Sequence, residues 1–385
     1  MPKILILTSV VGGGHVFRDI AIATELRKMI SPEYEIIFVS GGNAFQMLKD
    51  EGLKVELIEG VNFPSNLGAI DFLKFYFILL RSELIQLFQI RKLIKKYSPV
   101  LIILDEYFFL TDYLKSWKIP VVFMCDFLGV PRSSIFINPL KSVLEIFFDW
   151  LLYTHLSKKA DLWIYIGDPD HIPREEWRSR IYNENILHVE PITKLQYTEP
   201  PPKEIAREKL GFKKDEVVII VTVGCSGTGE YLLKAVIDAV PNLKKSIKQI
   251  RVELISGYGI TASNVELNPK QGVNIHGYVK NIEDFYVASD LIIIQCGITT
   301  ATECLMIGTP MIAVPITNHW EQEHTAQYLE NKFGTLIIKG KDVSPEIITD
   351  SIIKLLEAPS KNQFLFKGDG HRIAAKAISK VLISN

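Results

Sequence analysis

The sequence predicts an α/β protein built of two doubly wound domains, each a parallel sheet covered by helices on both faces. Apolar runs typical of strands alternate with helical patterns over almost all of the 385 residues. A proline-rich stretch interrupts this alternation near the middle, and a glycine-rich turn follows the first apolar run of each half. We therefore expect two domains that face each other across a cleft, with ligands beyond the carboxyl ends of the strands.

The first domain is expected to span residues 1–190. Its apolar runs are separated by helical patterns, so each run is predicted to be a buried parallel strand. The predicted strands are Ile4–Val10, Tyr34–Ser40, Val55–Glu59, Val100–Asp105, Val121–Asp126 and Leu162–Gly167.

Residues 191–202 are interpreted as a linker, because the four prolines of Glu190–Pro202 cannot continue a helix or a central strand. Residues 203–365 are expected to form the second domain, and residues 366–385 a C-terminal helix that can pack back on the first. The predicted strands of the second domain are Val217–Val223, Arg251–Ser256, Val273–Gly277, Leu291–Gln295, Met311–Pro315 and Thr335–Ile338.

Composition and charge limit the possible functions. The formal net charge of -1 gives no electrostatic reason to expect nucleic acid as a partner. The N-terminal run is typical of a first strand rather than a secretory signal, and no run of about 18 uncharged apolar residues predicts a transmembrane helix. The widely spaced cysteines indicate neither a zinc site nor disulfides, so a cytoplasmic location is expected.

The first glycine-rich turn, Gly12–Gly14, lies between a predicted strand and a helix that His15 opens. Glycine lets a ligand approach the backbone closely, and the N–H groups of a helix N-terminus favour an anion. The dinucleotide fingerprint GxGxxG is not matched, because its last glycine would fall at Phe17, and no P-loop pattern is present. The turn predicts a ligand held by backbone groups; a tight turn without a ligand is the alternative.

The second glycine-rich turn takes the same place in the second half, between a predicted strand and a helix. Small residues and hydroxyls at a helix start suit phosphate binding. We expect the two turns to face each other across the cleft. The residues expected to contribute here are Gly224, Ser226, Gly227, Thr228 and Gly229.

A third cluster lies within Gly277–Glu330. Its motif residues are Gly297, Thr299, Thr300, Glu303, Gly308, Thr309, Pro310, Glu321 and Gln322. With the turn GCSGTG, this pattern resembles the C-terminal, nucleotide-sugar-binding half of the GT-B glycosyltransferases, the group that contains MurG and the plant and animal UDP-sugar transferases. The resemblance covers most of the chain, is strongest over Val218–Gly229 and Gly277–Glu330, and is weak over Leu67–Arg180.

The resemblance implies a GT-B fold of two Rossmann-like domains and a role for each motif. Glu303 would accept hydrogen bonds from the ribose, and the loop carrying Tyr278 and Val279 would meet the base. Glu321 and Gln322 would read the sugar hydroxyls, since carboxylate and amide groups suit paired contacts with hydroxyls. The glycine-rich turn would hold the diphosphate leaving group. The alternatives are an exposed helix residue at Glu303 and a solvated helix start at Glu321 and Gln322.

The resemblance also gives a role to His15, beside Gly14, which is expected to contact the nucleotide sugar. In similar inverting enzymes a histidine in this loop is either the base for the acceptor hydroxyl or a partner of the diphosphate. An imidazole has a pKa near the working pH, which suits the base. Glu106 and Asp126 follow predicted strands and are candidates to face the acceptor; Asp126 is also a candidate to assist His15. The alternatives are a helix-capping histidine and plain turn acids.

No metal or other cofactor is expected. The string Asp168-Pro169-Asp170 matches the DxD metal site of a different glycosyltransferase fold, but the surrounding pattern argues against that fold. The resemblance implies a basic residue near the diphosphate, for which Lys194 is the candidate. The DQ pair of the family reads Glu321–Gln322 here, which leaves the donor sugar open.

Two stretches of the first domain, Asp71–Tyr97 and Ser133–Lys159, combine large apolar residues with basic ones. Such faces suit docking on an anionic membrane surface. Amphipathic helices packed on the sheet are the alternative. Because acceptors bind to the N-terminal domain in this fold, a lipid-linked acceptor, such as a sugar on a polyprenyl or dolichyl phosphate carrier, is expected.

The sequence therefore predicts an inverting glycosyltransferase that moves N-acetylglucosamine from a UDP-sugar to a hydroxyl of a lipid-linked acceptor, at the cytoplasmic face of the membrane. It also resembles the two-subunit transferase that extends dolichol-linked sugars, through its GGH-type loop. One alternative is an enzyme like UDP-N-acetylglucosamine 2-epimerase, which shares the fold. The other is a non-catalytic subunit that binds nucleotide sugars.

Overall fold

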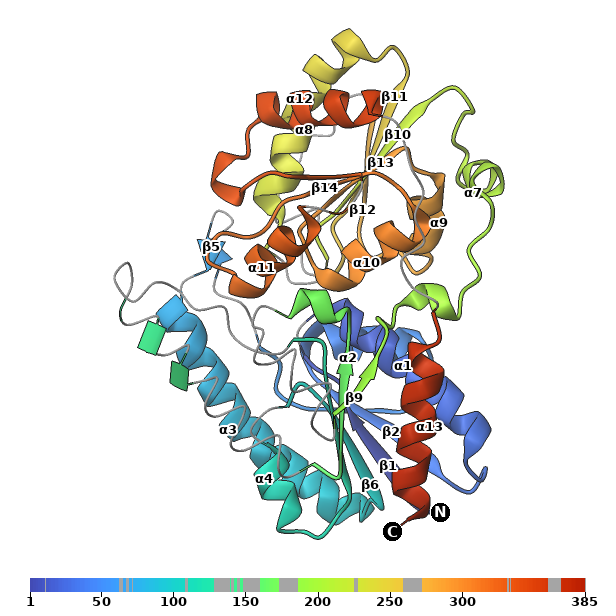
Figure 1. Cartoon of the computed structure of the whole chain (residues 1–385), viewed down its shortest axis with the longest axis vertical. Helices are drawn as coiled ribbons and strands as arrows, with labels where there is room; N and C mark the ends of the chain where they lie inside the picture. Colours follow the sequence, from blue (N-terminus) through green and yellow to red (C-terminus); the bar gives the residue numbers. More distant parts are fainter. Residues whose placement is uncertain are drawn as a thin grey trace. The chain divides into compact units, whose positions relative to one another are not determined.

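The computed structural model describes residues 1–10, 12–61, 65–66, 69–70, 72–107, 110–127, 139, 142–143, 146–147, 160–172, 186–224, 228–258, 272–330, 332, 334–358 and 368–384 (Figure 1). The chain divides into two compact units. Unit 1 comprises Met1–Asn62, Tyr76–Gln196 and Gly368–Asn385, and unit 2 comprises Phe63–Phe75 and Tyr197–Lys367.

Unit 1 contains a seven-stranded parallel sheet in the order β3-β2-β1-β6-β7-β8-β9. The order reverses at β1, which pairs with β2 on one side and β6 on the other. Ligand sites of doubly wound sheets lie at such a switch point, beyond the carboxyl ends of the strands. The strands are β1 (Lys3–Leu7), β2 (Glu35–Ser40), β3 (Val55–Leu57), β6 (Leu101–Asp105), β7 (Val121–Cys125), β8 (Leu162–Ile166) and β9 (Ile186–Val189).

Helices from both ends of the chain cover the sheet of unit 1. The N-terminal helix α1 (Gly13–Met29) packs against the C-terminal helix α13 (Gly370–Ile383), which also contacts β8 and β9 (Figure 1). Residues of α3 and α4, including Ile90 and Leu114, share an apolar core with the sheet. The other elements of unit 1 are α2 (Gly42–Asp50), α3 (Phe72–Tyr97) from Tyr76 onward, α4 (Leu110–Lys115), and the 3-10 turns η2 (Pro169–His171) and η3 (Lys194–Gln196). The hairpin of β4 (Ser65–Asn66) and β5 (Ala69–Ile70) belongs to unit 2.

Unit 2 contains a six-stranded parallel sheet in the order β12-β11-β10-β13-β14-β15. Alternate residues of β10 enter separate cores: Ile219 and Val221 pack on one face, Val218 and Ile220 on the other. Both faces are therefore buried. The strands are β10 (Val217–Thr222), β11 (Ile250–Ile255), β12 (Val273–His276), β13 (Leu291–Ile294), β14 (Met311–Ala313) and β15 (Thr335–Ile337).

The helices of unit 2 divide between these two cores. Helices α8 and α12 contribute to the first core, and α9, α10 and α11 to the second. Their bounds are α7 (Lys203–Leu210), α8 (Glu230–Ser246), α9 (Ile282–Ala288), α10 (Ile298–Ile307), α11 (Trp320–Leu329) and α12 (Pro345–Glu357), with a 3-10 turn η4 (Gly340–Asp342).

The predicted strands are confirmed in both units, although several end earlier than expected. The first stops at Leu7 rather than Val10, because the chain leaves the sheet before the glycine-rich turn. Strand β9 was not predicted; it has four residues, and His188 interrupts its apolar pattern. Among the described residues, no helix is both long and apolar enough to cross a membrane.

We predict that Gly370→Ala destabilises unit 1. A Cβ at Gly370 would lie 2.3 Å from the carbonyl oxygen of Glu190, which is backbone and cannot move aside cheaply. Overpacking of this kind costs about 1–3 kcal/mol of unfolding free energy, which calorimetry can measure. At Gly277, a Cβ meets no atom within 4 Å, so Gly277→Ala is the control. Equal stability of the two variants would contradict the close contact between α13 and β9.

Candidate active site

The carboxyl ends of three adjacent strands bring five charged side chains of unit 1 together. Strand β6 lies between β1 and β7, so the residues that follow these strands meet at one edge of the sheet. Asp105 ends β6 and Glu106 follows it, whereas Asp126 follows β7. His15 and Arg18 come from the first turns of α1, which begins after Gly12 with a left-handed φ of 85°.

His15 lies between two carboxyl groups. Its Nδ1 is 3.0 Å from Oδ2 of Asp105, and its Nε2 is 3.6 Å from Oε2 of Glu106. Asp105 is fully buried, whereas the side chains of His15 and Glu106 are 13% and 18% exposed. The buried Asp105 therefore contacts Nδ1 of His15, while Nε2 faces the partly exposed Glu106.

Arg18 lies beneath this pair and is almost fully buried. Its Nε donates to Oδ2 of Asp105 at 3.1 Å, and its Nη2 donates to Oδ1 of the same carboxylate. Its Nη1 donates to Oδ2 of Asp126 at 2.5 Å. One guanidinium thus joins the ends of β6 and β7, in the bidentate geometry that suits arginine and carboxylate.

The two partly exposed acids have opposite electrostatic environments. Burial raises the pKa of Glu106 well above its ordinary value, and the charge of Asp126 adds to this effect. Although burial also opposes ionisation of Asp126, Arg18 and His15 hold the pKa of Asp126 well below its usual range. Glu106 also has a left-handed φ of 63°, which is uncommon outside glycine and often marks functional sites.

The pKa of His15 is shifted upward by the acids around it. Burial and the charge of Arg18 oppose protonation, but Asp105 and Glu106 outweigh them and raise the pKa of His15 to about 9. The imidazole of the free protein therefore carries a proton at neutral pH. His15, the predicted base, therefore loses its proton only at a higher pH than an ordinary histidine does.

His15, Glu106 and Asp126 each offer one ligand atom, and these atoms lie within 4.8 Å of one another. This spacing would suit a metal ion. However, Arg18 already supplies a positive charge to Asp126. That no metal is needed stays a prediction.

The second glycine-rich turn follows β10 in unit 2, with Gly224 at a φ of 67°. Gly229 caps α8; a Cβ there would lie 2.2 Å from Cβ of Val223, so only glycine fits. The hydroxyl of buried Thr228 donates to Oε1 of Gln295 at 3.3 Å, and Nε2 of Gln295 is buried without a hydrogen-bond partner among the described residues. The predicted residues Ser226 and Gly227 lie outside the described residues.

The predicted ribose ligand, Glu303, lies in α10, which begins after Gly297. Thr299 and Thr300 occupy its first turn and are half-buried. Glu303 is 6% exposed, so the alternative of an exposed helix residue is wrong. Burial raises the pKa of the neighbouring Tyr286 hydroxyl, and the charge of Glu303 contributes to this shift.

The predicted sugar-reading pair opens α11. Nδ1 of His319 accepts a hydrogen bond from the backbone N–H of Gln322, and Oε1 of Gln322 accepts one from the N–H of Ile316 at 2.9 Å. Burial lowers the pKa of His319 to about 4, so its ring is neutral and can accept. Both Glu321 and Gln322 are half-buried, so this helix start is not a freely solvated one.

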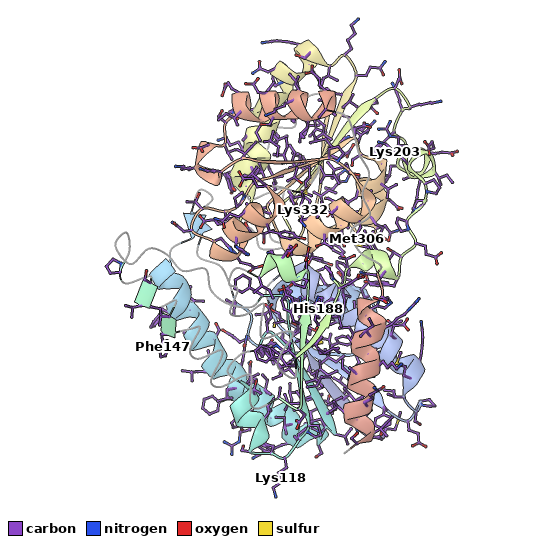
Figure 2. All side chains as sticks on the ribbon, in the orientation of Figure 1. Lys118, Phe147, His188, Lys203, Met306 and Lys332 are labelled. Atoms are coloured by element: carbon purple, nitrogen blue, oxygen red, sulfur yellow. The ribbon has the colours of Figure 1, made fainter. Side chains whose placement is uncertain are left out.

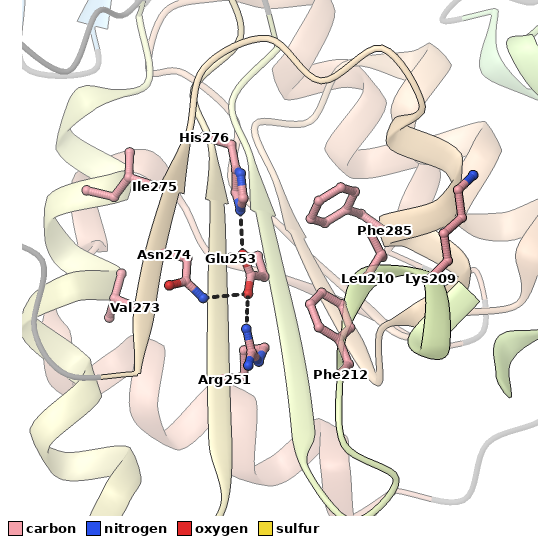
Figure 3. Close-up of a pocket in the computed structure, with 10 residues that line it drawn as sticks. All are labelled: Lys209, Leu210, Phe212, Arg251, Glu253, Val273, Asn274, Ile275, His276 and Phe285. Carbon is pink, nitrogen blue, oxygen red and sulfur yellow. Dashed lines mark hydrogen bonds and ion pairs between the residues drawn. The ribbon is translucent and has the colours of Figure 1, made fainter. Parts of the chain in front are cut away.

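The predicted base-binding loop follows β12, and the ring of Tyr278 in it stacks on Tyr258 with centroids 4.2 Å apart. Val279 is half-buried and packs against the core. Beside β11 and β12 lies a pocket of about 730 Å³, where Arg251, Asn274 and His276 all point at the buried Glu253 (Figure 3). The predicted donor residues do not line this pocket, so its polar ladder is assigned to stabilising the sheet edge.

Comparison with known proteins shows which glycosyltransferases this chain is similar to. Residues 218–378 match the model of the glycosyltransferase family 28 C-terminal domain. The chain is 24% identical over 361 residues to the UDP-N-acetylglucosamine–N-acetylmuramyl-(pentapeptide) pyrophosphoryl-undecaprenol N-acetylglucosamine transferase of Acetivibrio thermocellus, covering 90% of this chain and 88% of that protein. The chain is a MurG-like glycosyltransferase.

Solved structures show that this glycosyltransferase has the predicted GT-B fold. The glycotransferase of kitacinnamycin matches with a TM-score of 0.71 at 15% identity, covering 99% of this chain and 100% of that one. The MurG of Acinetobacter baumannii matches with a TM-score of 0.55 at 15% identity, and both chains are fully covered. At this identity, the likeness concerns the fold alone.

Sequence reasoning missed three residues of these sites. Asp105, not Asp126, is the hydrogen-bond partner of His15, so the expected assistance by Asp126 is corrected; Asp126 pairs with Arg18. Two successive acids at a strand end, and an arginine one helical turn after His15, were the available signals. Gln295, directly after β13, was read as the end of a strand.

Two further candidates have structural partners. The Nζ of Lys194 lies 5.2 Å above the ring centre of Phe17, and the side chain is buried. Asp168 caps the turn η2 by accepting a hydrogen bond from the N–H of Asp170. The DxD string is thus a local turn, and a role of Lys194 at the diphosphate stays a prediction.

We predict that His15 makes the stability of the glycosyltransferase pH-dependent. Because the folded pKa of about 9 exceeds the ordinary value of 6.5, the contribution of His15 is complete below pH 6.5 and is lost as pH rises through 9. The difference in unfolding free energy between wild type and His15→Gln should shrink by roughly 1–4 kcal/mol over that range, measured by urea denaturation. His188→Gln, at a ring that contacts the carbonyl of Gly167, is the control. A difference independent of pH would contradict the raised pKa.

Proposed function

We propose that the enzyme transfers N-acetylglucosamine, with inversion, from UDP-N-acetylglucosamine to a hydroxyl of a lipid-linked acceptor. The name of the Acetivibrio thermocellus relative supports both substrates, because it states this donor sugar and a pyrophosphoryl-undecaprenol acceptor. The relative is named as a transferase, which favours transfer over the epimerase and over a subunit that binds without turnover.

The contact between His15 and Asp105 is the observation that carries this proposal. When Nδ1 of His15 donates to the buried Asp105, the lone pair of Nε2 is the one that accepts a proton. A carboxylate that orients and supports an imidazole in this way is a recurrent arrangement for a general base. His15 is also the partly exposed member of the pair, so an acceptor hydroxyl can reach it.

The chemical step needs one proton transfer and one displacement. The acceptor oxygen forms a bond to the anomeric carbon, and the bond from that carbon to the diphosphate oxygen breaks. UDP leaves with the electron pair, and the hydroxyl proton passes to Nε2 of His15. Donors at the start of α8, together with Nε2 of Gln295, would stabilise the charge that develops on the diphosphate.

Unit 2 is proposed to bind the donor. The buried Glu303 would accept the ribose hydroxyls, and the loop of Tyr278 and Val279 would meet the uracil. Glu321 and Gln322, held in place at the start of α11, would contact the sugar. These groups are buried or half-buried, which supports the proposal, because a hydrogen bond in a partly desolvated site is electrostatically stronger than one in water.

We also propose that unit 1 docks on the cytoplasmic face of a membrane through α3. Phe77, Leu84 and Phe88 are 72%, 55% and 63% exposed and lie on one face of that helix, at spacings of seven and four residues. Arg81, Arg91 and Lys95 are exposed and share the same face. Phe147, labelled in Figure 2, is another half-exposed aromatic residue of unit 1. Apolar side chains among cations suit an anionic lipid surface.

We predict that UDP release depends on His15, on pH and on the lipid acceptor. In an assay with lipid-linked sugars and a panel of UDP-sugars, kcat/KM should rise about tenfold per pH unit up to about 9, because the unprotonated imidazole is the active form. His15→Ala should lose roughly 100-fold to 10,000-fold in kcat, and His188→Ala should not.

Other results would contradict the proposed role of His15, the proposed acceptor or the proposed donor sugar. If activity falls as pH rises through 9, the protonated His15 acts as a partner of the diphosphate and not as the base. Equal UDP release without lipid would contradict the lipid acceptor. A different sugar from the panel would replace N-acetylglucosamine.

We predict that Phe77→Ser combined with Phe88→Ser reduces cosedimentation with phosphatidylglycerol vesicles at least tenfold, because apolar area that enters the lipid is lost. Leu57 and Ile205 are 62% and 53% exposed elsewhere, so Leu57→Ser with Ile205→Ser is the matched control. Equal loss in both variants, or none in either, would contradict docking through α3.

A further inference from the structure

One nitrogen of His15 has two competing partners. Nη2 of Arg18 lies 2.7 Å from Nδ1 of His15, while Oδ2 of Asp105 lies 3.0 Å from the same atom. A ring nitrogen either carries a hydrogen and donates, or presents its lone pair and accepts. The protonated ring, which dominates at neutral pH, can only donate from Nδ1 to Asp105. In the neutral ring, Nδ1 either donates to Asp105 or accepts from Arg18, but it cannot do both.

The two choices leave the other nitrogen in different states. If Nδ1 of the neutral ring donates to Asp105, Nε2 has a lone pair and can take a proton. If Nδ1 accepts from Arg18, the hydrogen lies on Nε2, which then points toward Glu106 and cannot serve as a base. The partner of Nδ1 thus determines whether His15 is competent.

We propose that Arg18 is a positioning residue that competes with Asp105 for Nδ1 of His15 and so sets which ring nitrogen carries the proton. This inference rests on the proposed function, in which His15 accepts the hydroxyl proton at Nε2.

The surroundings of Arg18 fit this competition. Two carboxylates on neighbouring strand ends fix the guanidinium, so its Nη2 has little freedom to move away from His15. A residue that served only to pair Asp105 and Asp126 would not need a third contact with a ring nitrogen. The positive charge of Arg18 also lowers the pKa of His15, against the effect of the carboxylates.

Other charged groups surround the pair and are part of the same balance. Within α1, the neighbouring Asp19 is fully buried, and burial together with the charge of Asp105 raises its pKa well above the ordinary value. The turn η2 contributes His171, whose charge acts on Asp126. The remaining groups are Asp105, Glu106 and Asp126 at the strand ends.

Nitrogen-15 NMR of the imidazole ring tests this proposal on the free protein, without sugar nucleotide or lipid. A His15→Gln sample assigns the signal. In Arg18→Met, the neutral ring should shift to the form with its hydrogen on Nδ1, and the pKa of His15 should rise by about one unit or more, since a nearby positive charge is lost. Arg27→Met removes an exposed charge from the same helix and should change neither.

Arg18→Lys is the second variant, in case the unpaired carboxylates of Arg18→Met prevent folding. It keeps the charge but cannot present several N–H groups at fixed angles. The neutral ring should still shift toward hydrogen on Nδ1, with a pKa near that of wild type. A folded variant that keeps both the wild-type tautomer and the wild-type pKa would overturn the proposal.

The pH profile of UDP release separates this proposal from the proposed function. If both hold, the pH at which activity reaches half its maximum moves up in Arg18→Met with the NMR pKa. If the NMR signals move as expected but wild type shows no turnover with any UDP-sugar and lipid, the proposed function fails and the role of Arg18 stands. If turnover is normal but the NMR signals do not move, Arg18 only pairs the carboxylates.

Discussion

The buried Arg18 is the interaction on which the site of unit 1 depends. It is the cation that allows Asp105 and Asp126 to approach each other at the ends of two adjacent strands. Breaking a buried ion pair by removing one partner costs about 3–5 kcal/mol, because the other charge is left without compensation. The positions of His15 and Glu106 follow from this pairing, since both contact the groups that Arg18 holds.

Two turns of unit 2 that are candidates for donor binding are fixed by backbone constraints. Gly229 packs against Val223 with no room for a side chain, so the start of α8 lies directly on the end of β10. The loop between β14 and α11 is closed by backbone N–H groups that donate to the side chains of His319 and Gln322. Unit 1 thus contains a site held by buried ion pairs, and unit 2 contains turns held by close packing at a glycine and by hydrogen bonds to backbone N–H groups.

The strands could be predicted because most are continuous apolar runs between turn residues, and β9 could not because it is short and carries His188. His15, Glu106 and Asp126 could be proposed one by one, from their places after strands. Their partners could not, because the neighbours of β6 depend on strand order, which a single sequence does not encode locally. Asp105 was therefore interpreted only as the last residue of a strand, and its contacts with His15 and Arg18 were not predicted. The residues of unit 2 were found through a family resemblance, since spacing alone does not define a ribose ligand.

The packing of α13 on α1 has a consequence for synthesis. Unit 1 includes α13, whereas all of its strands precede α13 in the chain and are synthesised before it. Domains generally fold as units, and the N-terminal one usually folds first. Here α1, which carries His15 and Arg18, can pack against α13 only after some 340 further residues have been synthesised. All residues of unit 2 are synthesised before α13, so unit 2 can be complete while α1 still lacks the helix that packs against it.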